Sequence, residues 1–354
     1  MENQYKKLVI YYFSGTGNAK NTAIWISNIA EKNGIKTNVI NISKLEKRKD
    51  ISNPENALIG FCCPTHGFNF PPIMFHFILR FPKTKQNSCF IINTRAGMKA
   101  GKLFLPGLSG MAQYSTAIIL WLKGFKIKAT YPVDLPSNWI SFHPGIKEKA
   151  VKSIYTKRKE QVEDFAQDLF EGKRNFKGLY TIIIDLLITP IAFLYYIVGR
   201  FVLAKSFYAS KDCTKCDVCI KQCPVQAIKT IDKRPFWTYK CESCMHCMNI
   251  CPERAIETSH GYTIGMYYLI TSFLVIKFNK LFYINDFLDN LFPEWLSNTF
   301  DFFINSILIV LLIIGFYRIF HFLLRFRFFE RLVVYTSLTK WKFWRRYKSP
   351  KILN

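Results

Sequence analysis

The sequence predicts an α/β fold: a doubly wound parallel sheet at the N-terminus, followed by a small cysteine-rich α+β domain and C-terminal apolar helices. Three observations support this prediction. A buried-strand pattern runs directly into a Ser/Thr/Gly loop and a helical pattern, and similar strand-like runs recur up to residue 133. A cysteine pattern occurs twice in tandem over residues 213–252. Long uncharged runs follow residue 260.

The first strand is predicted at residues 7–13, a continuous apolar run of the kind that is buried in parallel sheets. The loop 14–18 follows at once, and a helical pattern covers 19–32. This order presents backbone N–H groups and a helix N-terminus to a phosphate. The loop is neither a Walker motif nor GxGxxG, so by itself it is a weak signal.

Four further strand-like runs complete the predicted sheet. Five strands in about 150 residues, with helices or loops between them, indicate an open doubly wound sheet. Residues 5–170 resemble the flavodoxin family, for which the strand order is 2-1-3-4-5 and FMN lies outside the carboxyl ends of the strands. The four runs are 36–42, 56–62, 88–93 and 126–133.

The resemblance implies an FMN site built from three loops. Residues 14–18 would hold the phosphate, the loop 64–68 would offer an aromatic ring to stack on the flavin, and 93–97 would offer backbone and hydroxyl groups to the polar edge of the ring. Candidate FMN-binding residues are Ser14, Gly15, Thr16, Gly17, Asn18, Thr65, His66, Gly67, Phe68, Thr94, Arg95, Ala96 and Gly97.

This site departs from the family at one position and has simpler alternatives at others. Flavodoxins usually carry a hydroxyl residue where this chain has Ala19, so one phosphate hydrogen bond is expected to be missing. Phe68 and Phe70 could instead be packing residues, and Arg95 could be a solvated loop charge.

The cysteine pattern Cys-x2-Cys-x2-Cys-x3-Cys-Pro occurs twice, with an offset of 28 residues. Ala227-Ile228 after the first copy is matched by Ala255-Ile256 after the second, which indicates a duplicated unit. The spacing suits a cube of iron and sulfide. Two structural zinc sites are the alternative, but zinc needs two plus two ligands and leaves the third evenly spaced cysteine unexplained.

The duplicated pattern resembles bacterial two-cluster ferredoxins, in which the fourth cysteine of each run serves the other cluster. The resemblance implies two [4Fe-4S] clusters with crossed ligation. His246 would lie beside a cluster or on the surface, and nearby aromatic residues would exclude water. One ligand set is Cys213, Cys216, Cys219 and Cys251, and the other is Cys241, Cys244, Cys247 and Cys223.

Composition points to a membrane surface. The 354 residues include 49 Lys and Arg against 24 Asp and Glu, a formal net charge of +25, and 50% are hydrophobic. Because the basic balance accompanies long apolar runs, an anionic membrane is a better partner than nucleic acid. Cys62, Cys63 and Cys89 have strand-like flanks and are predicted to be reduced and buried. No signal-peptide pattern precedes the first strand, so the leading domains are expected in the cytoplasm.

Two membrane crossings are predicted, at residues 262–284 and 302–322. The acidic connection 285–301 would lie outside and the basic tail inside. The connector 179–203 is long enough to cross, but a third crossing would place the cluster domain and the tail outside. We therefore expect an interfacial, re-entrant or protein-buried helix kinked at Pro190. Since lysines interrupt the first run, two amphipathic helices lying on the inner leaflet are the alternative.

The whole domain order resembles a family of bacterial flavodoxin/ferredoxin fusion proteins over about residues 5–260, including a turn at 136–139. We predict an electron-transfer protein at the cytoplasmic membrane, with FMN and two clusters facing the cytoplasm, and redox proteins or a small acceptor as partners. The alternative is a flavin-dependent iron–sulfur reductase of a substrate such as a quinone; a redox sensor has no supporting motif. Predicted domains are 1–172 (FMN), 173–205 (connector), 206–260 (ferredoxin), 261–324 (membrane hairpin) and 325–354 (basic tail).

Overall fold

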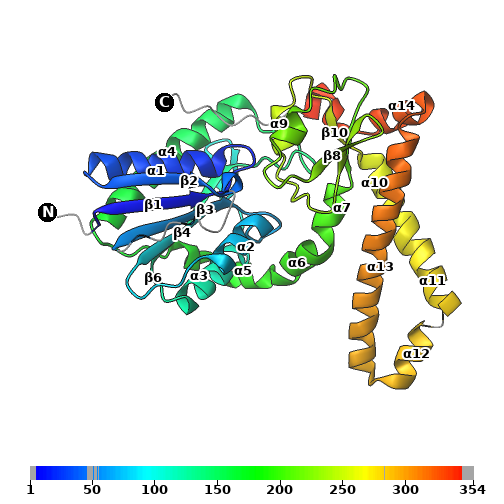
Figure 1. The fold of residues 1–354 in the computed structure, drawn as a ribbon, viewed down its shortest axis with the longest axis horizontal. Helices are drawn as coiled ribbons and strands as arrows, with labels where there is room; N and C mark the ends of the chain where they lie inside the picture. Colours follow the sequence, from blue (N-terminus) through cyan, green and yellow to red (C-terminus); the bar gives the residue numbers. More distant parts are fainter. Residues whose placement is uncertain (1–4, 46–50, 52–53, 55, 283, 345–354) are drawn as a thin grey trace. The chain divides into compact units, whose positions relative to one another are not determined.

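The computed structural model describes residues 5–45, 51, 54, 56–282 and 284–344 (Figure 1). These form two compact units. The N-terminal unit comprises residues 5–196 together with Cys244–Asn249. The second unit comprises Ile197–Ser243 and Ile250–Trp344.

The N-terminal unit contains the predicted doubly wound sheet. Its parallel strands have the order β2-β1-β3-β4-β6, the arrangement expected for a flavodoxin-like fold. The central strands are fully buried because helices cover both faces of a parallel sheet. The strands are β1 (Lys7–Tyr12), β2 (Lys36–Asn41), β3 (Ala57–Pro64), β4 (Ser88–Ala100), the short antiparallel β5 (Leu103–Leu105) and β6 (Lys126–Pro136).

Two pairs of helices cover the two faces of this sheet (Figure 1). On one side α1 packs against α4, with the Trp25 and Tyr155 rings 5.7 Å apart. On the other side α2 and α3 enclose a core in which Phe81 contacts Tyr11 and Phe61, each at 5.2 Å between ring centroids. The helices are α1 (Asn18–Lys32), α2 (Pro72–Arg80), α3 (Ala112–Leu122) and α4 (Glu148–Phe170); a 3-10 turn, η1 (Ile42–Lys44), follows β2.

Strand β4 is longer than the sequence pattern predicts. Residues 93–97 were expected to form a loop, but they continue the strand and pair with residues 132–136 of β6. Arg95 lies opposite Asp134 in this register, and the two side chains form a buried ion pair. Because that pairing joins residues 39 positions apart, the local pattern did not reveal it.

The connector is broken into two helical segments, Lys177–Leu187 and Thr189–Ala204, which meet at 79°. Pro190 lies in the first turn of the second segment, where its missing N–H is tolerated. The connector's elements are η3 (Lys177–Thr181), α5 (Ile182–Leu187), α6 (Thr189–Leu194), the π-helical η4 (Tyr195–Gly199) and α7 (Arg200–Ala204).

Asp185 attaches the first half of the connector to the N-terminal unit. Its carboxylate is fully buried and accepts hydrogen bonds from Ser109 N at 3.1 Å and Gly110 N at 2.7 Å. Tyr114 OH at 3.0 Å and Thr181 Oγ1 at 2.8 Å complete the set. A buried carboxylate needs several donors, and these are provided by protein groups. These contacts anchor this half of the connector at Asp185. Its apolar side chains stay exposed, with Ile183 at 73% and Leu187 at 76%, so it is attached to the N-terminal unit without being a protein-buried helix.

The second unit begins with a small ferredoxin-type fold. An antiparallel pair, β7 with β10, and a hairpin, β8 with β9, enclose the cysteine loops. The duplication extends to the backbone: φ is positive at Lys215, Asp217 and Gln226, and again 28 residues later at the matching Ser243, Met245 and Arg254. The elements are β7 (Phe207–Ala209), α8 (Val218–Lys221), β8 (Ile228–Ile231), β9 (Arg234–Trp237) and β10 (Ile256–Thr258). Between β9 and β10, α9 (His246–Ile250) falls mostly in the segment Cys244–Asn249 that is grouped with the N-terminal unit.

Two helices of the second unit are long and apolar enough to cross a membrane. They are His260–Phe282, of 23 residues, and Glu294–Leu323, of 30 residues. The first starts directly after β10, and the second returns to the same fold, where Tyr317 OH donates to Phe207 O at 2.8 Å. The elements are α10 (His260–Leu269), the π-helical η5 (Ile270–Leu274), α11 (Val275–Phe282), α12 (Ile284–Leu291) and α13 (Glu294–Leu323).

The described part of the basic tail packs on the ferredoxin-type fold, whereas the sequence suggested a separate segment. Tyr208 OH and Ser337 Oγ are 2.8 Å apart, and Thr258 N donates to Thr339 Oγ1 at 3.0 Å. Glu330 forms an ion pair with Arg234 at 3.2 Å. These contacts link positions about 80 to 130 residues apart, so no local pattern signals them. The elements are α14 (Arg327–Tyr335), η6 (Leu338–Lys340) and η7 (Lys342–Trp344).

Candidate cofactor sites

One pocket of the second unit is lined by Cys213, Cys216, Cys219 and Cys251. Cys213 and Cys216 come from the loop that leads into α8, Cys219 lies within α8, and Cys251 follows α9. This is the crossed set that the resemblance to two-cluster ferredoxins implies. The structure therefore brings together one complete predicted ligand set, with four thiols around one space, as a [4Fe-4S] cluster requires.

The electrostatics of this pocket suit a cationic metal centre. Burial raises the pKa of the Cys219 thiol to about 12, and the neighbouring Cys213, Cys251 and Cys216 raise it further. Thiols that repel one another's ionised forms bind iron readily, because the metal ions replace the protons and supply positive charge. The residues present thus fit an iron–sulfur cluster.

The duplicated alanines have a defined role in this fold. Ala227 N donates to Cys223 Sγ at 3.2 Å, and Ala255 N donates to Cys251 Sγ at 3.3 Å. Each alanine follows the fourth cysteine of its copy by four residues, so the two hydrogen bonds are equivalent in the repeat. Backbone donors to cluster sulfurs stabilise the more negative, reduced state and so contribute to the cluster potential.

The second ligand set is only partly assembled within one unit. Cys241 and Cys223 lie in the second unit, where burial raises the pKa of Cys241 to about 12, Cys223 raises it further and Lys205 lowers it. Cys244 and Cys247 are grouped with the N-terminal unit. The complete second set therefore remains a prediction.

The predicted phosphate loop lies between β1 and α1. Gly17 precedes the helix with φ of 107°, a conformation that disfavours residues with a side chain, and its N–H donates to Ser14 Oγ at 3.0 Å. The first turn of a helix offers N–H groups that have no acceptor within the helix. The loop thus keeps the backbone donors and the helix N-terminus that a phosphate needs.

The polar side chains of this loop form hydrogen bonds with other parts of the protein. Asn18 Nδ2 donates to Pro136 O at 2.9 Å, and Asn18 Oδ1 accepts from Tyr155 OH at 2.5 Å. Thr16 Oγ1 accepts from Asn138. Ala19 is fully buried, which fits the absence of a hydroxyl there. Phosphate binding in this chain would therefore rest chiefly on the backbone.

The loop after β3 places unpaired polar nitrogens in a buried aromatic cluster. His66 is 3% exposed, and its ring lies 6.1 Å from that of Trp139. Within the part of the chain that the structure describes, His66 Nδ1 and Trp139 Nε1 are buried and have no hydrogen-bond partner. Burial lowers the pKa of His66 to about 4, so its ring is neutral at pH 7. Because an unpaired buried polar atom is costly, this cluster favours a polar ligand.

The other residues of this loop have separate roles. Thr65 Oγ1 accepts from Asn93 Nδ2 at 2.8 Å. Phe68 has φ of 64° and is partly exposed, so it stays available to a ligand, whereas Phe70 is buried in the sheet core. The packing alternative therefore applies to Phe70.

The connector covers this loop, which sequence reasoning did not foresee. The Tyr195 and Trp139 rings are 5.4 Å apart, and a Cβ added at Gly67 would collide with the Tyr195 ring. Asn69 Nδ2 donates to Ala192 O at 2.8 Å. Trp139 was noted only through its turn, and no sequence signal marked Tyr195. Both would enclose a flavin ring and exclude water.

Arg95 forms a buried ion pair in this fold, so the alternative of a solvated loop charge is wrong, and its predicted contact with FMN stays a prediction. Arg95 Nε lies 2.5 Å from Asp134 Oδ1, and both side chains are buried. Asp134 also pairs with Arg158 at 3.4 Å and accepts from Gly107 N at 2.8 Å. A Cβ at Gly97 would meet Asp134 O at 2.6 Å, so this end of β4 is closely packed. Thr94 and Ala96 occupy the same paired strand.

The segment 244–249 contacts the phosphate loop within the N-terminal unit. His246 Nδ1 lies 2.6 Å from Gly15 O. A Cβ added at Gly15 would collide with the Cys244 carbonyl. Ser141 Oγ also donates to Met245 Sδ at 3.5 Å. His246 is therefore not a free surface residue; it joins a predicted ligand loop to the predicted phosphate loop.

The cysteine segment matches a known domain family. Residues 205–252 match the family described as 4Fe-4S dicluster domain, which supports iron–sulfur clusters at these cysteines. No curated protein matches the chain.

Several solved structures resemble the N-terminal part. A flavodoxin of Streptococcus pneumonia TIGR4 is 15% identical, covering 45% of this chain and 95% of its own, with a TM-score of 0.31. Flavodoxin 1 of Bacillus cereus is 16% identical, covering 46% and 95%, with a TM-score of 0.32. Rubredoxin oxygen:oxidoreductase of Desulfovibrio gigas is 17% identical, covering 47% and 37%, with a TM-score of 0.29. The flavodoxin-like assignment rests on the strand order of the sheet itself.

Proposed function

We propose that this protein transfers electrons between FMN, held by the N-terminal unit, and two [4Fe-4S] clusters, held by the eight duplicated cysteines. One observation carries the proposal: within the N-terminal unit, the segment that contains the predicted ligands Cys244 and Cys247 contacts the predicted phosphate loop through His246 and Gly15. A flavin at that loop would lie beside a segment that carries two predicted cluster ligands. Electron transfer needs such proximity more than it needs acid or base residues.

Each part of the chain would serve one requirement. The backbone of residues 14–18 would bind the FMN phosphate, and His66, Trp139 and Tyr195 would enclose the ring. When bound, FMN exchanges one or two electrons and each cluster exchanges one, so the assembly would connect two-electron with one-electron partners. The protein supplies position, water exclusion and hydrogen bonds to sulfur.

The same proposal places the protein at the cytoplasmic membrane. Helices His260–Phe282 and Glu294–Leu323 would form a crossing hairpin, and both join the second unit at their ferredoxin ends. Basic residues dominate after position 314, which favours the cytoplasm for that end. Redox proteins or a small electron acceptor would be the partners.

Metal and flavin analysis of anaerobically purified protein tests the proposal. We expect about eight iron atoms per chain and acid-released flavin that chromatography identifies as FMN. Cys213→Ser and Cys241→Ser should each lose about half of the iron and keep the flavin, because the cofactors have separate binding residues. Two tightly bound zinc ions without iron, or no flavin after incubation with excess FMN, would refute the corresponding half of the proposal.

A further inference from the structure

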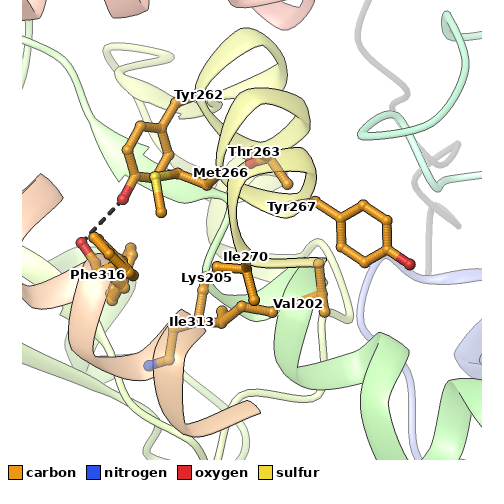
Figure 2. A pocket seen from close by; sticks show the side chains of 10 residues that line it. Val202, Lys205, Tyr262, Thr263, Met266, Tyr267, Ile270, Ile313 and Phe316 are labelled. Atoms are coloured by element: carbon orange, nitrogen blue, oxygen red, sulfur yellow. Dashed lines mark hydrogen bonds between the residues drawn. The ribbon is translucent and has the colours of Figure 1, made fainter. Parts of the chain in front are cut away.

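A pocket lies in the second unit where the two candidate membrane helices join the ferredoxin-type fold (Figure 2). Val202 of α7, Met266 of α10 and Ile270 of η5 line it from one side, and Ile313 and Phe316 of α13 line it from the other. Apart from Val202, these residues belong to the early turns of the first helix and the late turns of the second. The pocket would therefore sit near the membrane surface, on the side of the ferredoxin fold.

The pocket is mostly apolar. Met266, Ile270 and Ile313 belong to a hydrophobic cluster that continues between the helices to Leu274 and Leu308. Two polar side chains also line the pocket: Lys205, which lies beside Ile313, and Tyr262, whose hydroxyl donates to Phe316 O at 2.9 Å (Figure 2). A π-helical turn begins at Ile270, and such turns are frequent at functional sites. A mostly apolar pocket between two candidate membrane helices suits a largely apolar ligand with a small polar head.

The polar groups of the pocket favour a ligand whose head is uncharged. Lys205 is 5% exposed, and its ammonium group donates to Trp237 O and lies 4.7 Å from the centre of the Tyr317 ring. Tyr317 OH donates to Phe207 O at 2.8 Å. A phosphate head would need an accessible cation, whereas this one is enclosed by rings. A phospholipid headgroup therefore fits poorly.

The wall of the pocket also reaches a predicted cluster ligand. Lys205 interacts electrostatically with Cys241. Tyr317 OH accepts from the backbone N–H of Trp237 at 3.4 Å, four residues before that cysteine. A neutral ligand at this place would lie beside an electron carrier and would be supplied from the lipid phase.

We propose that this pocket binds a membrane quinone, with its ring at Tyr262 and its isoprenoid tail along Ile270 and Ile313. The inference rests on the proposed electron-transfer function and names its lipid-soluble partner. In the forward direction, a quinone would take up two electrons, one at a time from the reduced clusters, and two protons from water. It would leave as the quinol, and the clusters would return to their oxidised state.

Binding of short-tailed quinones to the full chain in nanodiscs tests the site. The probes are decylubiquinone and a naphthoquinone with a short prenyl tail. Met266→Trp fills the pocket and should weaken binding at least about tenfold. Ile264→Trp is the matched control: it lies two residues away on the same helix, is 70% exposed, and should leave the dissociation constant unchanged. Equal affinity in the two variants, or binding of neither probe, would overturn the proposal.

Photolabelling locates the ligand directly. An azidoquinone should label peptides that contain Tyr262–Ile270 or Ile313–Tyr317, and excess decylubiquinone should protect them. If native mass spectrometry instead finds a phospholipid that decylubiquinone does not displace, the pocket is a lipid site and the quinone proposal fails.

Cys241→Ser separates this inference from the electron-transfer function. The variant should lose iron but bind decylubiquinone with unchanged affinity, because Cys241 does not line the pocket. Wild-type protein that binds quinone but contains no iron would refute the electron-transfer function alone. Iron-loaded protein that binds no quinone would refute this inference alone.

Discussion

At the scale of single residues, the informative positions are buried polar groups and backbone conformations that are unusual. Gly17 holds a positive φ before α1, His66 is neutral and unpaired at one nitrogen in the described structure, and Lys205 is an enclosed cation beside a predicted cluster ligand. Each of these features costs free energy, and a folded chain keeps it only where another interaction offsets that cost. Substitution at each of the three positions tests what the residue does.

Gly17→Leu should empty the flavin site and leave the clusters intact. A leucine at φ of 107° is strained, and straightening the loop would move the N–H groups that face the phosphate. Gly34→Leu is the control, since Gly34 also has a positive φ, of 72°, but nothing lies within 4 Å of its added Cβ. The measurement is the ratio of flavin and iron to protein. Equal flavin loss in both variants would show that general instability, and not the loop, explains the effect.

Lys205→Met should lower the reduction potential of one cluster. The buried ammonium group stabilises extra negative charge near Cys241. Its removal should destabilise the reduced cluster and lower its reduction potential by on the order of 50 mV, which corresponds to ~1 kcal/mol for one electron. The exposed Lys229 gives the control variant Lys229→Met, with little expected change. Redox titration followed by electron paramagnetic resonance resolves the two clusters. A shift that is the same for both clusters would contradict the assignment.

His66 should make folding stability depend on pH. Burial lowers its pKa from 6.5 to about 4, so between these values the unfolded chain binds a proton that the folded chain does not. The contribution of the neutral His66 side chain to the free energy of unfolding is fully present above pH 6.5 and declines as the pH falls toward 4. At pH 5 the free energy of unfolding should be lower by about 2 kcal/mol. We expect His66→Gln to lose less stability than the wild type between pH 7 and pH 5 in urea titrations of flavin-free protein. Parallel pH profiles would refute the prediction.

At the scale of elements, the connector is apolar enough to suggest a membrane helix, yet part of it is bound to the N-terminal unit. Asp185 receives four hydrogen bonds, and Tyr195 covers the loop after β3. The bend of 79° lies between these two points of attachment. Residues 177–196 of the connector therefore form a strap that is attached at Asp185 and covers the loop after β3 at Tyr195. The attachment can be tested at Asp185.

Asp185→Ala should release the connector. The substitution leaves the N–H groups of Ser109 and Gly110 and the hydroxyl of Tyr114 without their acceptor, at a cost of about 3 kcal/mol. Limited proteolysis should then cut within residues 177–196 faster than in the wild type. Asp168→Ala, which removes an exposed ion pair with Lys173, should change stability by less than about 1 kcal/mol. Unchanged cleavage in Asp185→Ala would mean that the strap is held elsewhere.

At the scale of the whole molecule, the described tail belongs to the ferredoxin-type fold and both hairpin helices end there. If the helices cross the membrane, the tail and the clusters must share one side. This is the arrangement that the charge pattern of the sequence predicts.

Labelling of introduced cysteines tests the two crossings. In intact spheroplasts an impermeant maleimide should react with Asn298→Cys, an exposed position in the first turns of α13 and within the acidic connection 285–301. It should react with Lys342→Cys, in the described part of the tail, only after lysis. The unmodified chain measures background from native cysteines. Reaction at both positions only after lysis would favour two helices lying on the inner leaflet.

The sequence by itself determined what depends on spacing along the chain. The duplicated cysteines, the order of the strands and the two apolar helices are local or periodic signals, and the structure contains the expected sheet, one complete crossed cysteine set and both helices. Period and spacing report local geometry directly, which is why these features were predictable.

Only the tertiary structure decided which distant residues meet. The pairing of Arg95 with Asp134, the anchoring of Asp185, the cover of Gly67 by Tyr195 and the packing of Ser337 on Tyr208 each join segments far apart in the chain. An arginine in a loop and an arginine in a buried pair look alike in sequence, since the difference lies in the partner. Burial then turns these partners into constraints, because a charge or a polar atom removed from water must be satisfied by whatever the fold brings next to it.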